Sequence, residues 1–257
     1  MPLNPTIDNW TGRRVWVIGA STGIGAAIAR RLLASGARVA LSARSTEKLR
    51  EIAHDKPQSL VAPLDVTDVA SVHAAMNAVR VRFGGFDLAL VVAGTYAEMR
   101  AQSFDLPRAR NLLDVNLHGV LNCLDALLPL LLSQQSGGIA IVASVAGYVG
   151  LPKALVYGPG KAALINLAES LYGDLHPHGF GVYLVCPGFV ATPLTENNDF
   201  KMPALISADS AATATLDGIA AGRFEIHYPK RFTRWLKLLR VLPYPLHLAA
   251  VRRFTGL

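Results

Sequence analysis

The sequence predicts an α/β protein in which helices cover both faces of a doubly wound parallel sheet of seven strands. Seven short segments rich in Val, Ile and Leu recur along the chain, and longer segments with helical spacing separate them. The short segments are almost continuously apolar, as strands covered on both faces are, because right-handed crossovers place helices on each side of a parallel sheet. We expect one domain over residues 1–228 and a C-terminal helical extension over 229–257.

The predicted elements alternate as this topology requires. The first strand, 14–18, leads through a glycine-rich turn into a helix over 25–35, and a second strand and helix follow at 38–42 and 46–53. A third strand, 59–64, precedes a helix over 69–83, and a fourth, 88–92, precedes a long apolar helix over 108–133. The last three strands are 139–143, 182–185 and 224–227, with a helix over 161–175 before the second of these. In such sheets a ligand binds beyond the carboxyl ends of the strands, where the strand order reverses.

The positive charge of the protein is confined to its C-terminal part. The formal net charge is +7 over 257 residues, with 25 basic and 18 acidic side chains, and 51% of the residues are hydrophobic. Residues 222–257 hold eight of the basic residues and one acidic residue, so residues 1–221 are balanced. This composition excludes a disordered chain and a disulfide scaffold. The local charge argues against a nucleic-acid-binding surface over the whole protein.

The cysteine residues and the N-terminal segment indicate the cellular compartment and the metal content. Cys123 and Cys186 lie in apolar runs, and we expect reduced thiols and no metal site, because no Cys or His ligand spacing accompanies them. The first residues show no cationic segment followed by an apolar one, and no uncharged apolar run reaches about 18 residues. We therefore expect a cytoplasmic protein.

A glycine-rich turn follows the first strand and opens the first helix. Glycine allows close approach of a phosphate to the backbone, and the helix N-terminus supplies free N–H groups. The turn predicts a pyrophosphate site, although such turns also occur without ligand. The residues of this turn that we expect to bind the cofactor are Gly19, Ser21, Thr22, Gly23, Ile24 and Gly25.

The ends of the next strands suggest which dinucleotide binds. Arg44 follows the second strand where an acidic residue would bind the ribose of NAD, so a 2′-phosphate is favoured and NADP is the expected cofactor. The alternative is a solvated arginine at the sheet edge. Asp65 and Val66 could contact the adenine, or Asp65 could cap a helix. Ala93 and Gly94 place small residues beside the cofactor.

The predicted catalytic residues are Tyr157 and Lys161, together with Ser144 and Asn116. Tyr157 and Lys161 are four residues apart, which places them on one face of a helix, where an ammonium group would lower the pKa of the phenol. Such pairs often arise by chance on surfaces. Ser144 at the end of the fifth strand and Asn116 in the long helix add weight to the pair.

These motifs together resemble those of the short-chain dehydrogenase/reductase family, which has a single Rossmann domain of this length. The resemblance covers about residues 12–228. It implies that Tyr157 is the general acid or base, that Ser144 polarises the carbonyl oxygen, and that Lys161 holds the nicotinamide ribose. It also implies that Asn116 holds a water of a proton relay. Residues implied to line the nicotinamide side are Pro187, Gly188, Val190 and Thr192, in addition to Tyr157 and Lys161. The family further implies a small-molecule substrate and a homo-oligomer, either a dimer or a tetramer.

The expected activity is NADP-dependent hydride transfer to or from a carbonyl or secondary alcohol. Residues 189–207 read as a mobile loop over the substrate. Few charged residues accompany the apolar candidates, so we expect a lipid-like or steroid-like ketone. These candidates are Tyr148, Val149, Leu151, Leu194 and Met202. The alternative is a catalytically silent NADP-binding sensor or scaffold, which would have no use for the phenol.

The C-terminal extension reads as a basic amphipathic helix over 230–242, with Trp235, Leu236 and Leu239 on its apolar side. Leu238 and Val241 blur the division between the two sides. The Trp and Leu side could lie in the headgroup region of an anionic membrane, which would place the protein peripherally on the inner membrane surface. Alternatively, that side docks on the body or on a neighbouring subunit. Binding of nucleic acid is disfavoured, because the extension carries no recognition module.

Overall fold

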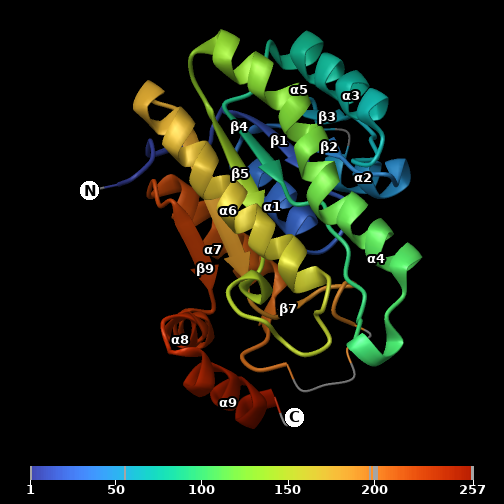
Figure 1. Cartoon of the computed structure of the whole chain (residues 1–257). Coiled ribbons are helices and arrows are strands. Elements are labelled where there is room, and N and C mark those ends of the chain that lie inside the picture. Colours follow the sequence, from blue (N-terminus) through green and yellow to red (C-terminus); the bar gives the residue numbers. More distant parts are fainter. Residues whose placement is uncertain (1, 55, 197, 199–201, 256–257) are drawn as a thin grey trace.

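The computed structural model describes all residues except 1, 55, 197, 199–201 and 256–257. Its centre is a parallel sheet of seven strands in the order β3-β2-β1-β4-β5-β6-β9 (Figure 1). The strands are β1 (Arg14–Ile18), β2 (Arg38–Ser42), β3 (Ser59–Val61), β4 (Leu88–Val91), β5 (Gly138–Val142), β6 (Gly181–Pro187) and β9 (Glu225–Tyr228). The prediction of a seven-stranded, doubly wound parallel sheet is confirmed.

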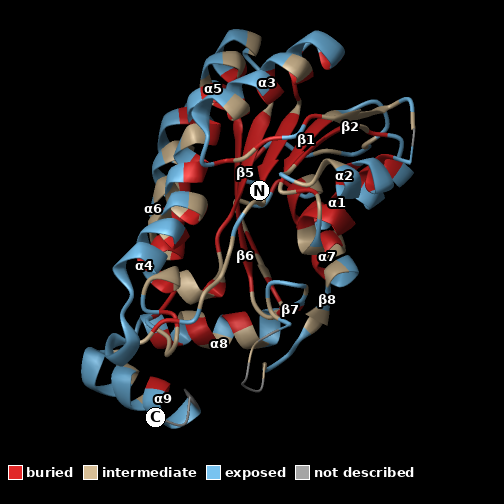
Figure 2. Ribbon diagram, turned by 90° about the vertical axis from the view of Figure 1, so that its right-hand side faces the viewer, coloured by how far each residue is buried: buried red, intermediate tan, exposed pale blue. Residues whose placement is uncertain are grey.

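Helices cover both faces of this sheet. The helices on one face are α1 (Gly23–Ala34), α2 (Thr46–Ala53) and α7 (Ala208–Ala220), and those on the other are α3 (Val69–Phe83), α5 (Gly119–Gln134) and α6 (Tyr157–Leu175). Alternate residues of each strand enter opposite cores, since Val15 and Val17 of β1 pack with α1 whereas Trp16 and Ile18 pack with α3 and α5. Figure 2 shows the buried strands between helices whose outer sides are exposed.

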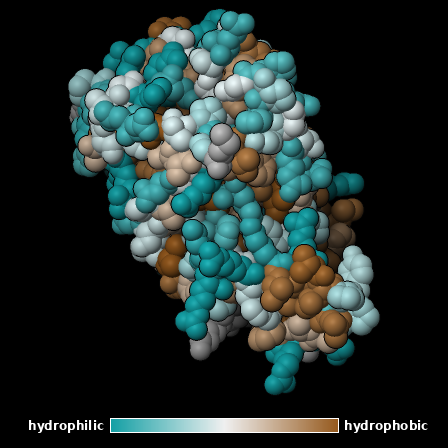
Figure 3. All heavy atoms as spheres, turned by 90° about the vertical axis from the view of Figure 1, so that its left-hand side faces the viewer, coloured by the Kyte–Doolittle hydropathy of each residue, from teal (hydrophilic) through white to brown (hydrophobic). Residues whose placement is uncertain are grey.

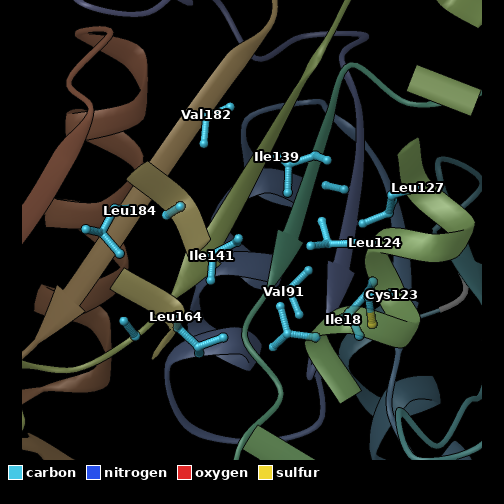
Figure 4. Packing of buried hydrophobic residues seen from close by; sticks show 14 of the residues in the cluster. Ile18, Val91, Cys123, Leu124, Leu127, Ile139, Ile141, Leu164, Val182 and Leu184 are labelled. Atoms are coloured by element: carbon cyan, nitrogen blue, oxygen red, sulfur yellow. The ribbon is translucent and has the colours of Figure 1, made fainter. Parts of the chain in front are cut away.

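The core on the α5 and α6 side is built from apolar residues of neighbouring strands. Ile18, Val91 and Ile141 come from β1, β4 and β5, and they point toward α5 and α6 (Figure 4). Leu127 of α5 and Leu164 of α6 are fully buried against them. This packing fixes the carboxyl ends of β1, β4 and β5, from which the functional loops emerge.

The strand order reverses at β1, which pairs with β2 on one side and with β4 on the other. The loop after β1 donates Gly19 N–H and Ala20 N–H to Ser42 O, at 2.7 and 3.0 Å, and Ala93 after β4 donates to Ile18 O at 2.9 Å. These bonds hold the loops after β1 and β4 at one edge of the sheet, which is the ligand position for this topology.

The long helix predicted over 108–133 is interrupted. It consists of α4 (Leu106–Leu113), a π-helical turn (Asp114–His118) and α5. By length and composition the stretch Leu106–Gln134 could span a membrane, but 44% of its apolar window is buried inside the protein. Core helices pass the same test, and Cys123, Leu127 and Leu131 of α5 lie in the core of this molecule.

Two segments differ from the predicted outline in the C-terminal third. Helix α7 was absent from the prediction, because its Ala, Ser and Thr residues give little apolar periodicity. Within the predicted loop over 189–207, the described residues form two short paired strands, β7 (Val190–Ala191) and β8 (Ile206–Ser207). Asn197 of that loop lies outside the described residues.

The C-terminal extension consists of α8 (Lys230–Arg240) and α9 (Tyr244–Thr255). Leu236 and Leu239 of α8 are buried in the core cluster of α5 and α6. The interpretation in which the Trp and Leu side of this helix enters a membrane is therefore wrong for these residues, because the body of the protein covers them. Docking on the body, the second interpretation, describes α8.

Candidate active site

A single cavity of about 630 Å³ brings the predicted site residues together. It lies along the carboxyl ends of the strands, where the strand order reverses. Every residue expected to bind the cofactor or to act in catalysis lines it: Gly19, Ser21, Thr22, Gly23, Ile24, Gly25, Arg44, Asp65, Val66, Ala93, Gly94, Asn116, Ser144, Tyr157, Lys161, Pro187, Gly188, Val190 and Thr192. The glycine-rich loop and the catalytic candidates thus share one cavity, as the spacing of the motifs indicates.

The glycine-rich loop has the geometry of a phosphate site. A Cβ on Gly19, whose φ is +99°, would lie 2.5 Å from Ala93 N, and one on Gly25 would lie 2.1 Å from Gly19 O. Helix α1 begins at Gly23 beside the cavity, and the side chain of its N-cap residue Thr22 makes no capping bond. The N–H groups of its first turn therefore face the cavity without a side-chain acceptor, which fits a pyrophosphate.

Two cations line the end of the cavity beyond β2. Arg44 follows β2, and Lys48 lies in the first turn of α2, which Ser45 caps by accepting from Lys48 N–H. Sequence reasoning missed Lys48. Its place in the first turn of the predicted helix at 46–53, close after Arg44, was the available signal.

Asp65 and Val66 follow β3 at the same end of the cavity. Asp65 Oδ1 accepts from the Thr67 N–H and the Thr67 hydroxyl, at 2.9 and 2.8 Å, and these bonds help to hold the pKa of Asp65 below its usual value. The N-cap of α3 is Asp68, so the alternative role of Asp65 as that cap is wrong. Val66 packs against Gly119, where a Cβ would lie 2.7 Å from Val66 Cγ2.

Tyr157 and Lys161 lie in the first turns of α6, and Ser144 lies at the end of β5. Lys161 Nζ is 5.8 Å from the centre of the Tyr157 ring and donates to Val142 O at 3.0 Å. The Oγ of Ser144 accepts from Ala146 N–H at 3.1 Å. The three side chains are brought together because β5 and α6 are neighbours in the fold, as the spacing predicts.

Burial is the main influence on the pKa values of Tyr157 and Lys161. It raises the pKa of Tyr157 to about 12, although a hydrogen bond with Ser144 opposes the rise, and it lowers the pKa of Lys161 to about 8. The pKa of the phenol is therefore raised overall, and a lowering by the ammonium group of Lys161 stays a prediction. Desolvation is the largest cause of the raised pKa, so Tyr157 holds its proton at neutral pH.

Asn116 lies in the π-helical turn between α4 and α5, and it is buried. Its amide group donates to Thr95 O and Leu112 O, at 2.8 and 2.9 Å, and its Oδ1 accepts from Thr95 N–H at 3.2 Å. A Cβ on Gly94 would lie 2.9 Å from Asn116 Oδ1 and 3.5 Å from Lys161 Nζ, so both side chains approach the backbone there. Both amide hydrogens bond to the protein, and the relay role of Asn116 stays a prediction.

Only some of the apolar residues that we expect around the substrate line the cavity. Leu194 lines the cavity, but Tyr148 and Val149 are buried in the core cluster, and the Tyr148 hydroxyl donates to Glu225. Met202 lies beside Asn198, whose Nδ2 approaches Met202 Sδ at 3.4 Å. Pro193 and Thr195 line the cavity and were not predicted. A run of residues after a strand does not show which of them point into the cavity.

Comparisons with known proteins agree with this geometry. A family model described as short chain dehydrogenase matches residues 13–202. An uncharacterized oxidoreductase of Myxococcus xanthus is 34% identical over 246 residues, which cover 94% of this chain and 97% of that protein.

Solved structures similar to most of the chain include the following two. One is a short chain dehydrogenase from Burkholderia cenocepacia in complex with NADP, with a TM-score of 0.83 and 28% identity over 95% of this chain and 98% of that chain. The other is a short chain dehydrogenase/reductase from Burkholderia phymatum in complex with NAD, with a TM-score of 0.82 over 90% of this chain and 94% of that chain. At 23% identity, the second likeness shows the fold alone. The chain belongs to the short-chain dehydrogenase family of oxidoreductases.

Proposed function

We propose that the protein is an NADP-dependent oxidoreductase that interconverts an apolar ketone and the corresponding secondary alcohol. The observation that carries this proposal is the single cavity, which has the glycine-rich loop at one end and Ser144, Tyr157 and Lys161 at the other. A protein that only senses a dinucleotide would need the first end and not the second.

The preference for NADP rests on the two cations at the adenosine end. Arg44 and Lys48 are both exposed and line the cavity, and Ala43 occupies the position after β2 where a carboxylate would repel a 2′-phosphate. Charge-assisted hydrogen bonds from a guanidinium group suit a phosphate dianion. We expect the cations to hold the 2′-phosphate and the loop at 19–25 to hold the pyrophosphate.

The residues at the other end supply the proton chemistry. When bound, the nicotinamide supplies or accepts the hydride. Tyr157 is neutral at pH 7 and donates its phenolic proton to the carbonyl oxygen during reduction, and Ser144 donates a hydrogen bond to the same oxygen. Lys161 uses one N–H for Val142 O, and its other N–H groups are available for the ribose hydroxyls.

The expected substrate class follows from the charges around the catalytic phenol. Arg44, Lys48 and Asp65 are charged but lie at the adenosine end, so Lys161 is the charged lining residue at the catalytic end among the described residues. Leu194 and Pro193 line the cavity, and the Tyr96 ring lies edge-on to Tyr157 with 5.1 Å between ring centres. These contacts favour an uncharged, apolar carbonyl compound.

A homo-oligomer forms part of the proposal. Phe104, Leu106, Leu121 and Leu132 are large apolar residues in or next to α4 and α5, and between 43% and 53% of each is exposed. Exposed apolar residues on neighbouring helices favour burial against a second copy. Sedimentation velocity of the purified protein measures this, and a monomer at micromolar concentration would contradict it.

Turnover of the reduced cofactor tests the activity. We expect NADPH oxidation with lipid-like ketones, and a decrease in kcat of about 10²- to 10⁴-fold in Tyr157→Phe, because the proton donor is lost. NADPH affinity should stay within about threefold, since the phosphate loop is untouched. Tyr172→Phe is the matched control, because its hydroxyl bonds Leu3 O away from the cavity.

Three outcomes would count against parts of this proposal. Equal turnover in wild type and Tyr157→Phe would contradict the assigned proton donor. Tight NADPH binding without turnover of any ketone would favour the silent sensor. Activity confined to short charged keto acids would contradict the apolar substrate class.

A further inference from the structure

Large apolar residues near the junction of α8 and α9 are exposed. We call this group the apolar corner; it consists of Leu238, Val241, Tyr244, Leu246 and Leu248, whose exposed fractions lie between 55% and 80%. Figure 3 shows a cluster of hydrophobic residues at the end of the molecule that α8 and α9 occupy in Figure 1. Soluble proteins seldom leave a large exposed apolar cluster on one surface without a binding role.

The apolar corner is held in place by contacts on its other side. Leu236 and Leu239 anchor α8 in the core, and His247 Nδ1 lies 2.8 Å from Leu239 O. The Trp235 and Phe254 rings pack edge to face with centres 4.1 Å apart, which joins α9 to α8. Helices α8 and α9 are therefore held by these residues, and the residues of the apolar corner are not needed to hold them.

Positive charge flanks the corner on both sides. Lys230, Arg231 and Arg234 precede it along α8, and Arg252 and Arg253 follow it at the end of α9; all five are exposed. None of the five forms an ion pair with a carboxylate among the residues that the structure describes. The first three lie in the first turns of α8, where the helix dipole disfavours cations.

The cations beside the apolar corner favour some binding partners over others. Two copies meeting through this face would bring their arginines together, and like charges oppose such a contact. A lipid surface with anionic headgroups satisfies both features, because the apolar residues enter the headgroup boundary while Lys and Arg attract the phosphates. We propose that the apolar corner and its five flanking cations form a docking surface for an anionic membrane.

Helix α8, which carries part of the apolar corner, also contacts the wall of the catalytic cavity. Phe232 of α8 packs on Phe189, with 5.7 Å between ring centres, and a Cβ on Gly188 would lie 3.3 Å from Phe232 Cδ1. Gly188 lines the cavity. Where the proposed apolar ketone is the substrate, a membrane is also the phase in which such a molecule dissolves. The docking itself does not depend on that activity.

Sedimentation with vesicles tests the surface in the full chain. We expect the protein to pellet with phosphatidylcholine vesicles that contain one-third phosphatidylglycerol, and to bind pure phosphatidylcholine vesicles at least about tenfold more weakly. Reversing two charges in Arg231→Glu with Arg234→Glu should weaken binding to the anionic vesicles by about twentyfold or more, since each basic residue contributes roughly fivefold. Leu238→Ser with Tyr244→Ser should weaken it by about tenfold or more.

Matched controls separate this surface from general charge and hydrophobicity. Arg30→Glu with Arg50→Glu changes the net charge equally on exposed residues of α1 and α2, and Val81→Ser removes a side chain that is 84% exposed on α3. Both controls should change vesicle binding less than about twofold. Retained NADPH binding verifies that each variant is folded. The proposal is overturned if wild type does not pellet, if corner variants bind like wild type, or if the charge control loses as much binding as the corner pair.

Discussion

At the scale of single residues, Lys161 makes stability depend on pH. It is the only lysine buried among the described residues, and burial lowers its pKa to about 8 from an ordinary value of 10.5. Between pH 8 and 10.5 the unfolded chain binds this proton more strongly than the folded chain, so the free energy of unfolding rises with pH in that window.

Comparison with Lys161→Met isolates this effect. The free energy of unfolding of wild type minus that of the variant should increase by on the order of 1–3 kcal/mol between pH 7.5 and 10, measured by urea denaturation without cofactor. Lys48→Met is the control, because Lys48 is exposed and its difference from wild type should stay constant. A constant difference for Lys161→Met as well would mean that its ammonium group is solvated.

Arg44 and Lys48 determine the second residue-scale prediction, which concerns cofactor preference. Arg44→Ala with Lys48→Ala should weaken NADPH binding by about 10- to 100-fold, because two charged donors to the 2′-phosphate are lost. NADH lacks that phosphate, and its affinity should change by less than about threefold. Fluorescence titration with both cofactors measures the two constants, and equal losses for NADPH and NADH would contradict the assigned role.

Much of the site could be predicted at this scale because its residues follow strand ends. Gly19, Arg44, Asp65, Gly94 and Ser144 each come directly or closely after a strand, and parallel strands bring their carboxyl ends to one edge. The pKa of Tyr157 could not be predicted in the same way. Its direction depends on burial by residues distant in sequence, which the spacing of Tyr157 and Lys161 does not report.

At the scale of elements, α8 is tied to the loop that carries Ser144. Lys237 of α8 forms an ion pair with Glu225 of β9, and Glu225 Oε1 accepts from the Tyr148 hydroxyl. Tyr148 follows the short 3-10 helix (Val145–Gly147) whose N-cap is Ser144. Burial and the hydrogen bond with Glu225 both raise the pKa of Tyr148, so the phenol stays protonated and acts as the donor.

A double-mutant cycle tests this tie. Tyr148→Phe and Lys237→Met should each lower the free energy of unfolding by about 1 kcal/mol, a moderate value because Glu225 and Lys237 remain partly exposed. Their effects should be non-additive by about 0.5–1.5 kcal/mol, since both side chains bind the same carboxylate. Arg234→Met replaces Lys237→Met in the control cycle. Additivity in both cycles would show that the three residues do not act together.

Helices and strands were predicted correctly where apolar residues recur with a strong period. The prediction failed where this period is weak. Strands β1 and β2 have the predicted bounds, whereas the helix over 108–133 is broken by the π-helical turn that bonds Asn116 to Thr95. That turn depends on a contact with the loop after β4, which no local pattern reports. Helix α7 was missed because it buries small residues such as Ala211 and Ala212.

At the scale of the whole molecule, the first residues close the amino end of the sheet. Leu3 N–H and Asn4 N–H donate to Gly222 O, at 3.0 and 2.9 Å, just beyond α7. The side chain of Asn4 donates to Val182 O at 2.7 Å and accepts from Val182 N–H at 2.9 Å. β9 begins to pair with β6 only at Leu184, so the Asn4 amide takes the place of a neighbouring strand at Val182.

Asn4 therefore stabilises the fold by joining parts of the chain that are far apart in sequence. Asn4→Ala removes both bonds and leaves the buried Val182 N–H and C=O without this partner, which should lower the free energy of unfolding by about 2–4 kcal/mol in urea denaturation. The exposed Asn9, which accepts one bond from Thr11 N–H at 2.9 Å, gives the control Asn9→Ala, expected to cost less than about 1 kcal/mol. Activity per folded molecule should be unchanged in both variants, because the cavity lies at the opposite, carboxyl end of the strands. Equal destabilisation by the two substitutions would mean that the first residues do not complete the sheet.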